Sequence, residues 1–283
     1  GPMSTANLDD LDHAELEDIN ESAKLSRYTL GLWRRRSYIW YVATSELRSQ
    51  QINTVLGNLW HLLNPALSIA IYYLIFGLLL KTTRGVDNFI LFLTVGLFVF
   101  QFTQRSTISG ATSIGKNVGL MRSIKFPRAL LPLTSTLTQT LSALPTFALV
   151  FVVALITGQA PIWQWALFPA VIGCQVLLNL GAALIAARLT THFEDTTQVL
   201  PFAFRLLFYA SGVIFSADAY ATGSWAWLFT ANPLYCYISI TRWTVMGGDI
   251  NSSLFVSAAL WTAVLAVGGF MWFRAAEERY GRV

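Results

Sequence analysis

Long apolar stretches separated by short polar or charged segments dominate the sequence from about residue 59 onward. An α-helix needs roughly 20 apolar residues to cross the hydrocarbon core of a bilayer. Because backbone groups in lipid must form their hydrogen bonds within their own segment, such stretches are expected to be helices. Six stretches qualify as spans: 59–80, 88–109, 132–157, 162–187, 199–217 and 254–275. The pattern predicts an all-α integral membrane protein.

Composition agrees with this prediction. Hydrophobic residues make up 54% of the 283 residues and charged residues only 12%, whereas a soluble protein has about a quarter charged residues. Gly1 and Pro2 precede Met3 and resemble the remnant of a cleaved expression tag. Cys174 and Cys236 lie in different segments without metal-ligand spacing, so we expect neither a disulfide nor a metal site.

The distribution of basic residues predicts the orientation. With a cytoplasmic N-terminus, 16 of the 19 Lys and Arg residues fall on the inner side, and only Lys81, Arg84 and Arg242 fall outside. Cytoplasmic loops of membrane proteins are enriched in these residues. We therefore expect six crossings with both termini in the cytoplasm. The net charge of +4 reflects this topology and gives no reason to expect nucleic-acid binding.

Two segments precede the membrane domain, which we place at 53–283. Residues 1–29 form an acidic tail, which is either a solvated disordered segment or a contact arm for a basic partner. Residues 30–52 combine Trp and Tyr with Arg34, Arg35 and Arg36, the composition of an amphipathic helix in the headgroup plane. Anionic lipid binding and simple juxtamembrane anchoring are both compatible with this segment.

The loop between the second and third spans contains basic residues interleaved with apolar ones, among them Lys116, Arg122, Lys125, Phe126 and Arg128. This pattern predicts a short cytoplasmic helix with one basic and one apolar edge. Such a helix can dock in a groove of another protein. The residues alone also allow an ordinary positively charged inner loop.

The same loop contains a partial nucleotide-binding motif. Gly110, Gly115 and Lys116 satisfy GxxxxGK, but Asn117 stands where the motif requires Ser or Thr. A phosphate-binding loop must also follow a buried strand, whereas this one follows a membrane span. We interpret the match as chance and expect no catalytic residues and no bound cofactor in this chain.

The outer loop, about 218–252, is too long for a turn and too apolar for a free loop. We expect two short re-entrant helices, 219–230 and 233–247, separated at Asn232-Pro233. Trp and Tyr favour the membrane interface, and the aromatic residues of this loop are Tyr220, Trp225, Trp227, Phe229, Tyr235, Tyr237 and Trp243.

Polar side chains recur at helical spacing in four spans. Stripes that contain ionisable or large polar groups are expected to line a pathway: His61, Asn64, Ser68 and Tyr72 in span 1, and Arg205, Tyr209, Gly212 and Ser216 in span 5. Small or amide-bearing stripes are expected to hold helices together: Ser135, Thr138, Ser142 and Thr146 in span 3, and Gln175 and Asn179 in span 4. Arg205 could alternatively extend to the interface.

Several segments together resemble a known family. These are ELRSQQINTVLGNLWHLLNP at 46–65, the run LFLTVGLFVFQF, Ser113-Ile114 with Asn117, FPRALLPL at 126–133, and Asn232-Pro233-Leu234 followed by Arg242. Over about residues 40–280 the chain resembles the permeases of ABC-2 type polysaccharide exporters of the Wzm–Wzt kind. Among these it is similar to the actinobacterial exporters of a lipid-linked cell-wall galactan.

The resemblance implies a homodimer in the bacterial inner membrane with two ATPase subunits, which would bind the ATP and Mg. Residues 113–129 would be the coupling helix on the ATPase, and spans 1 and 5 would line the channel. The helices at 219–247 would form an outer gate that includes Tyr220, Trp225, Trp227, Asn232, Pro233, Tyr235 and Arg242. The substrate would be a polysaccharide on a polyprenyl diphosphate.

Such a substrate suggests two groups of residues. Aromatic faces for sugar rings would come from Tyr72, Phe98, Phe102, Phe208, Tyr209 and Phe215, which core packing would equally explain. Cations for the diphosphate would come from Arg205, then Arg105, then Arg34, Arg35 and Arg36, and binding of lipid headgroups is the alternative for these.

Other functions remain open. A membrane-embedded enzyme of lipid-linked glycan assembly would need carboxylates or His facing a cavity, and the predicted spans contain His61 but no Asp or Glu. A passive channel would need no ATPase partner. An ABC-2 permease for teichoic acid, O-antigen or a drug is a further alternative.

Overall fold

The computed structural model describes residues 29–49, 59–81, 85–119, 127–216 and 226–277. Every regular element in these ranges is helical. The α-helices are α2 Arg36–Ser49, α3 Trp60–Tyr72, α4 Phe89–Lys116, α6 Leu130–Ile156, α7 Phe168–His192, α8 Thr196–Ala210, α9 Ala226–Ala231, α10 Pro233–Met246, α11 Ser253–Ala263 and α12 Gly269–Glu277. Two π-helical turns, η2 Tyr73–Leu79 and η5 Val264–Gly268, continue α3 and α11, and the 3₁₀ turn η3 Trp163–Leu167 precedes α7.

Five of the predicted spans are confirmed as helices long and apolar enough to cross a membrane. They are Leu62–Leu79, Phe89–Lys116, Leu130–Ile156, Trp163–His192 and Ser253–Ala276. Four of them end within about five residues of the predicted limits. The helix predicted at 88–109 continues to Lys116. Near this end it packs against α6, where Ser135 donates to Ser109, and against α7, where Gly110 closely approaches Ala183.

The sixth expected span, 199–217, is wrong in its extent. The helix here, α8, has 15 residues and ends at Ala210. Gly212 then adopts a φ of +64°, a left-handed conformation that glycine tolerates without steric cost, and the chain turns. Gly212 and Ser216 therefore do not share a helical face with Arg205 and Tyr209.

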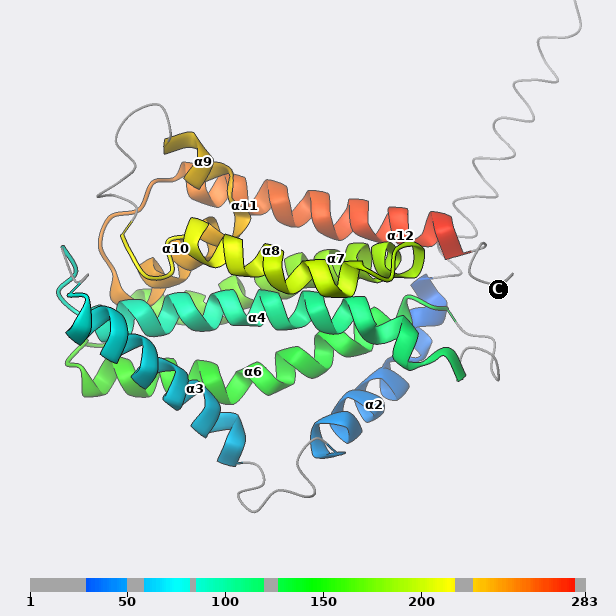
Figure 1. Cartoon of the computed structure of the whole chain (residues 1–283), viewed down its shortest axis with the longest axis horizontal. Coiled ribbons are helices and arrows are strands. Elements are labelled where there is room, and N and C mark those ends of the chain that lie inside the picture. Colours follow the sequence, from blue (N-terminus) through cyan, green and yellow to red (C-terminus); the bar gives the residue numbers. More distant parts are fainter. Residues whose placement is uncertain (1–28, 50–58, 82–84, 120–126, 217–225, 278–283) are drawn as a thin grey trace, which may run out of the picture.

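The helices form an elongated bundle around α4 (Figure 1). Helices α6, α7 and α10 pack directly on α4, and α12 packs on α7. Helix α2 and the end of α12 lie at one end of the bundle, and α9 and α10 lie at the other (Figure 1). Helix α3 crosses the outside of the bundle at an angle.

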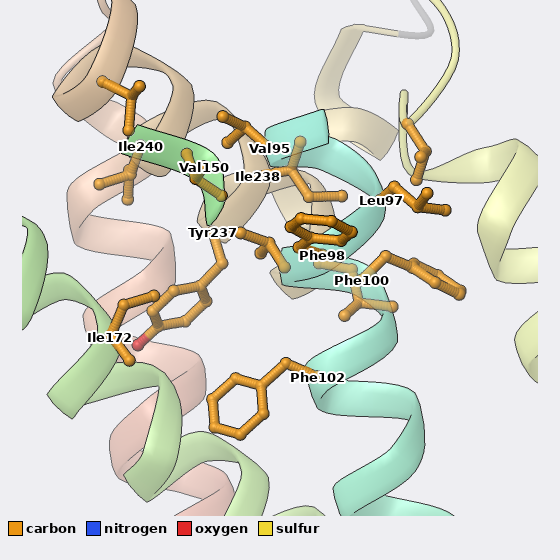
Figure 2. Close-up of a cluster of buried hydrophobic side chains, with 14 of the residues drawn as sticks. Val95, Leu97, Phe98, Phe100, Phe102, Val150, Ile172, Tyr237, Ile238 and Ile240 are labelled. Atoms are coloured by element: carbon orange, nitrogen blue, oxygen red, sulfur yellow. The ribbon is translucent and has the colours of Figure 1, made fainter. Parts of the chain in front are cut away.

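The core is built on α4. Every residue from Leu91 to Phe100 is buried, because this segment is apolar on all of its faces. Figure 2 shows Phe98, Phe100 and Phe102 meeting side chains from other helices, among them Val150, Ile172, Tyr237 and Ile238. By contrast, only 6% of the residues in the α3–η2 span are buried, so this helix presents most of its surface outward.

A buried polar network joins α4 to α7. The Thr103 hydroxyl donates to Oδ1 of Asn179 at 2.7 Å, and Nε2 of Gln175 donates to the Val99 carbonyl at 2.9 Å and to Thr103 at 3.0 Å. The prediction that Gln175 and Asn179 hold helices together is confirmed. In α6, likewise, Ser135 hydrogen-bonds to Ser109 of α4 at 2.6 Å.

One close backbone approach fixes how the last span packs. A Cβ on Gly181 of α7 would lie 2.2 Å from the carbonyl carbon of Leu265 in η5. Likewise, a Cβ on Gly269 of α12 would lie 2.7 Å from the Gly181 carbonyl oxygen. Small residues allow membrane helices to approach this closely. The contact positions α11, η5 and α12 along one side of α7.

Candidate functional site

The polar stripes of α3 and α8 meet through aromatic rings. The Tyr72 ring of α3 lies 5.5 Å from the Phe208 ring of α8, and Phe208 lies 5.5 Å from Tyr209. Tyr72 is half-buried and Tyr209 is 59% exposed. The structure therefore brings together the predicted pathway residues of spans 1 and 5 at Tyr72, Phe208 and Tyr209.

The two stripes continue along the outside of α3 and α8. Asn64 is exposed, and Ser68 is half-buried and donates to the Asn64 carbonyl at 2.9 Å. Arg205 is exposed on α8, with its guanidinium carbon 5.4 Å from the centre of the Phe202 ring. The side chain of His61 lies outside the described part of the structure. We call the set Asn64, Ser68, Tyr72, Arg205 and Tyr209 the α3–α8 face.

Other aromatic candidates lie inside the subunit. Phe98 and Phe102 are 2% and 3% exposed, and Phe102 packs edge-on against Phe147 at 5.5 Å. Phe208 is buried against Phe100 at 5.2 Å. Phe215 is half-buried and packs 6.4 Å from Phe229. These rings pack inside the chain. Of the predicted aromatic residues on α3 and α8, Tyr209 is exposed and Tyr72 is half-buried, and Phe202 on α8 is also exposed, at 66%.

The remaining cationic candidates are all on the surface. Arg105 is exposed on α4 and donates to Oε1 of Gln101 at 3.4 Å. Arg34, Arg35 and Arg36 are exposed at the N-terminal end of α2, where Arg36 lies 5.4 Å from the Trp33 ring. These cations belong to helices other than α3 and α8.

The predicted coupling segment, 113–129, is only partly described. Residues 113–116 belong to α4, and Lys116 is exposed at the end of that helix. Arg128 is half-buried just before α6. Arg122, Lys125 and Phe126 lie outside the described residues, so the helix expected there stays a prediction.

The predicted division of the outer loop at Asn232-Pro233 is confirmed. Helix α9 ends at Ala231 and α10 begins at Pro233, while Tyr220 and Trp225 lie outside the described residues. Oδ1 of Asn232 accepts from the Leu234 amide at 3.0 Å, and its Nδ2 donates to Oγ of Ser211 at 3.0 Å. Such a cap followed by Pro favours helix initiation. Trp227 is 64% exposed, and the Tyr235 ring lies 5.3 Å from Phe229.

Arg242 is buried, whereas its place in the predicted outer gate would suggest an exposed position. It is 9% exposed and donates to three backbone carbonyls: Phe92 at 3.1 Å, Gly212 at 2.7 Å and Val213 at 2.7 Å. Its guanidinium carbon also lies 3.3 Å from the centre of the Phe92 ring. We call this arrangement the Arg242 clamp, since it fastens α10 to α4 and to the turn after α8.

The clamp depends on a gap in the side chains of α4. A Cβ on Gly96 would lie 2.4 Å from Nη2 of Arg242, so glycine leaves room for the guanidinium. This contact could not be predicted from the sequence, because an Arg in an outer loop usually faces solvent.

Comparison with known proteins agrees with this architecture. The profile of the ABC-2 type transporter family matches residues 37–246. The chain is 27% identical over 245 residues to the O-antigen export system permease protein RfbA of Klebsiella pneumoniae, covering 86% of this chain and 93% of that protein. It is 24% identical over 242 residues to the polysialic acid transport protein KpsM of Escherichia coli, covering 82% and 91%. With most of its length matched, the chain belongs to the ABC-2 type transporter family.

Proposed function

We propose that this chain is the membrane subunit of an exporter that moves a polyprenyl-diphosphate-linked polysaccharide, a cell-wall galactan, from the cytoplasm across the inner membrane. It acts as a homodimer with two ATPase subunits, which bind ATP and Mg, and its N- and C-termini are cytoplasmic. The family match and the names of relatives that export O-antigen and polysialic acid support the substrate class.

The observation that carries the proposal is the α3–α8 face. It carries two tyrosines, an amide and a guanidinium on the outside of α3 and α8, two helices that this proposal places within the membrane. Polar groups that face lipid are costly, so they are expected to face water or a ligand. Two copies that face each other through α3 and α8 would enclose a passage with these groups on its wall. Tyrosine combines an apolar ring with a hydrogen-bonding hydroxyl, which suits a sugar chain.

The direct test is reconstitution of the chain with its ATPase subunit in proteoliposomes that contain the lipid-linked galactan. We expect the glycan to become accessible on the far side of the membrane only when ATP is present. Transfer without ATP would indicate a passive channel. No transfer by a complex that still hydrolyses ATP would contradict the proposed substrate.

Arg205→Ala is expected to lower export by about tenfold while assembly with the ATPase stays normal, since a charge-assisted hydrogen bond to a phosphate oxygen is worth about 1.5–3 kcal/mol. Arg205→Lys is expected to restore export only in part, because an ammonium lacks the planar fork of a guanidinium. Export is measured per amount of protein in the membrane. Arg48→Ala, which removes an exposed cation from α2, is the control. Wild-type export by both Arg205 variants would place the diphosphate site elsewhere.

The purified chain alone is expected to neither bind nor hydrolyse ATP, because its GK sequence lies within the last turn of the membrane-length helix α4 and lacks the Ser or Thr of a P-loop. Photolabelling with an azido-ATP analogue checks this. In the complex, Lys116→Ala should leave labelling of the ATPase subunit unchanged. Labelling of the isolated chain that Lys116→Ala abolishes would overturn this expectation.

A further inference from the structure

A cavity of about 360 Å³ lies between α2, α4 and α6, at the end of the bundle opposite α9 and α10. Figure 1 shows α2 slanting against this end of the bundle. The cavity reaches the lower size limit of typical small-ligand pockets, which is about 300 Å³. It lies apart from the α3–α8 face, since its walls come from other helices.

The floor of the cavity is buried and rich in hydroxyl groups. Ser113, Thr134 and Ser135 are buried there, and Ser135 hydrogen-bonds to Ser109. The hydroxyl hydrogens are already used within the protein, since Ser113 donates to the Gly110 carbonyl and Thr134 to the Leu130 carbonyl, both at 2.7 Å. The hydroxyl oxygens can still accept hydrogen bonds, which suits a ligand that carries N–H or O–H donors.

The rim carries one charge of each sign. Glu46 of α2 and Lys116 of α4 are exposed there, and they are the two charged residues among the lining groups of the described chain. The Thr138 hydroxyl of α6 lies 3.3 Å from Oε2 of Glu46, which helps to position the carboxylate. Within the described part of the chain neither charge forms an ion pair.

We propose that this cavity binds the headgroup of a zwitterionic aminophospholipid, with its ammonium at Glu46 and its phosphate at Lys116. A primary ammonium donates three hydrogen bonds, and a carboxylate accepts them. A purely anionic headgroup could pair with Lys116 but would leave the Glu46 carboxylate without a cationic partner. The hydroxyl oxygens of the floor would accept further hydrogen bonds from the ammonium.

The location agrees with this ligand. Tyr38 and Tyr41 line the cavity and are 45% and 71% exposed, and Trp33 and Trp40 on the neighbouring surface are 67% and 55% exposed. Exposed Trp and Tyr mark the headgroup level of a membrane protein. The site requires only that α2 lies at this level, so its test does not depend on what the subunit transports.

The test is native mass spectrometry of the delipidated full-length chain with equimolar dioleoyl phosphatidylethanolamine, phosphatidylglycerol and phosphatidylcholine. We expect phosphatidylethanolamine to bind about tenfold more tightly than the other two, equivalent to one charge-assisted hydrogen bond. Glu46→Gln should remove this preference, and Lys116→Gln should weaken the binding of phosphatidylethanolamine and phosphatidylglycerol alike. Glu194→Gln and Lys81→Gln, which change exposed charges outside the cavity, are the matched controls.

Two outcomes would overturn the proposal. The first is a Glu46→Gln protein with an unchanged headgroup preference. The second is displacement of the phospholipid by a polyprenyl diphosphate in a manner that requires Lys116, because the cavity would then hold the headgroup of the polyprenyl carrier. Hydrogen exchange of α2 in the unmodified protein gives a measurement independent of the variants. Phosphatidylethanolamine should slow this exchange and phosphatidylglycerol should not.

Discussion

Replacing Arg242 with methionine is expected to lower the unfolding temperature of the subunit by roughly 6–12 °C. Methionine fills most of the space of the arginine side chain but leaves the buried carbonyls of Gly212 and Val213 without their donor, while the Phe92 carbonyl keeps its helical hydrogen bond. Each buried group left unpaired costs about 1–3 kcal/mol, so the loss from these two carbonyls is about 3 kcal/mol. The measurement is thermal unfolding of purified protein in detergent.

Two further variants separate the clamp from the charge itself. Arg242→Lys keeps a cation but cannot reach three carbonyls at once, so we expect an intermediate loss of stability. Arg205→Met makes the same substitution at an exposed arginine and should change the unfolding temperature by less than about 2 °C. Equal unfolding temperatures for Arg242→Met and the wild type would show that the clamp does not hold α10 in place.

Gly181→Val is expected to destabilise the subunit by about 3 kcal/mol, the upper end of the usual cost of overpacking. The new Cβ would lie 2.2 Å from the carbonyl carbon of Leu265, and a backbone atom cannot move aside by changing rotamer. The helix pair α7 and α11–η5–α12 would have to separate. The fraction of folded protein during titration with a denaturing detergent measures the effect.

The same helix provides a matched control. Gly173 also lies in α7, but a Cβ there would meet no atom within 4 Å. Gly173→Val should therefore change stability by less than about 1 kcal/mol, since helix propensity differs little between the two residues. If both valine variants unfolded at the wild-type detergent concentration, the α7–η5 contact would not contribute to stability.

Hydrophobic pattern was enough to place most of the membrane helices. Five spans could be predicted because a helix of the required length and apolarity leaves a direct mark on the sequence. The end of α8 could not be predicted this way, since the apolar run continues beyond Ala210. The chain turns there because of the φ of Gly212 and the bonds from Arg242, which lies 30 residues further along the chain.

In the candidate site, too, features local to one helix could be predicted, and features that depend on contacts between helices could not. The positions of Tyr72 and Tyr209 on the polar stripes of their helices could be predicted from their spacing. The structure brings the two residues together through Phe208. Whether an aromatic ring faces outward or packs inside could not be predicted from the sequence, because Phe98 and Tyr72 are each compatible with a buried or an exposed position. The cavity at Glu46 and Lys116 combines helices distant in sequence, and the Ser and Thr stripe at 135–146 predicted only a contact between helices.

Helix α4 is also a stiff mechanical link between the two ends of the molecule. Its 28 residues contain no proline and no π-helical turn, whereas α3, α6 and α8 each contain a proline. At 1.5 Å per residue it is about 42 Å long. One end carries Lys116, and the other contacts Arg242 through Phe92 and Gly96. A displacement of the Lys116 end would therefore move α10 and the turn after α8 by a similar distance, because the helix would bend little.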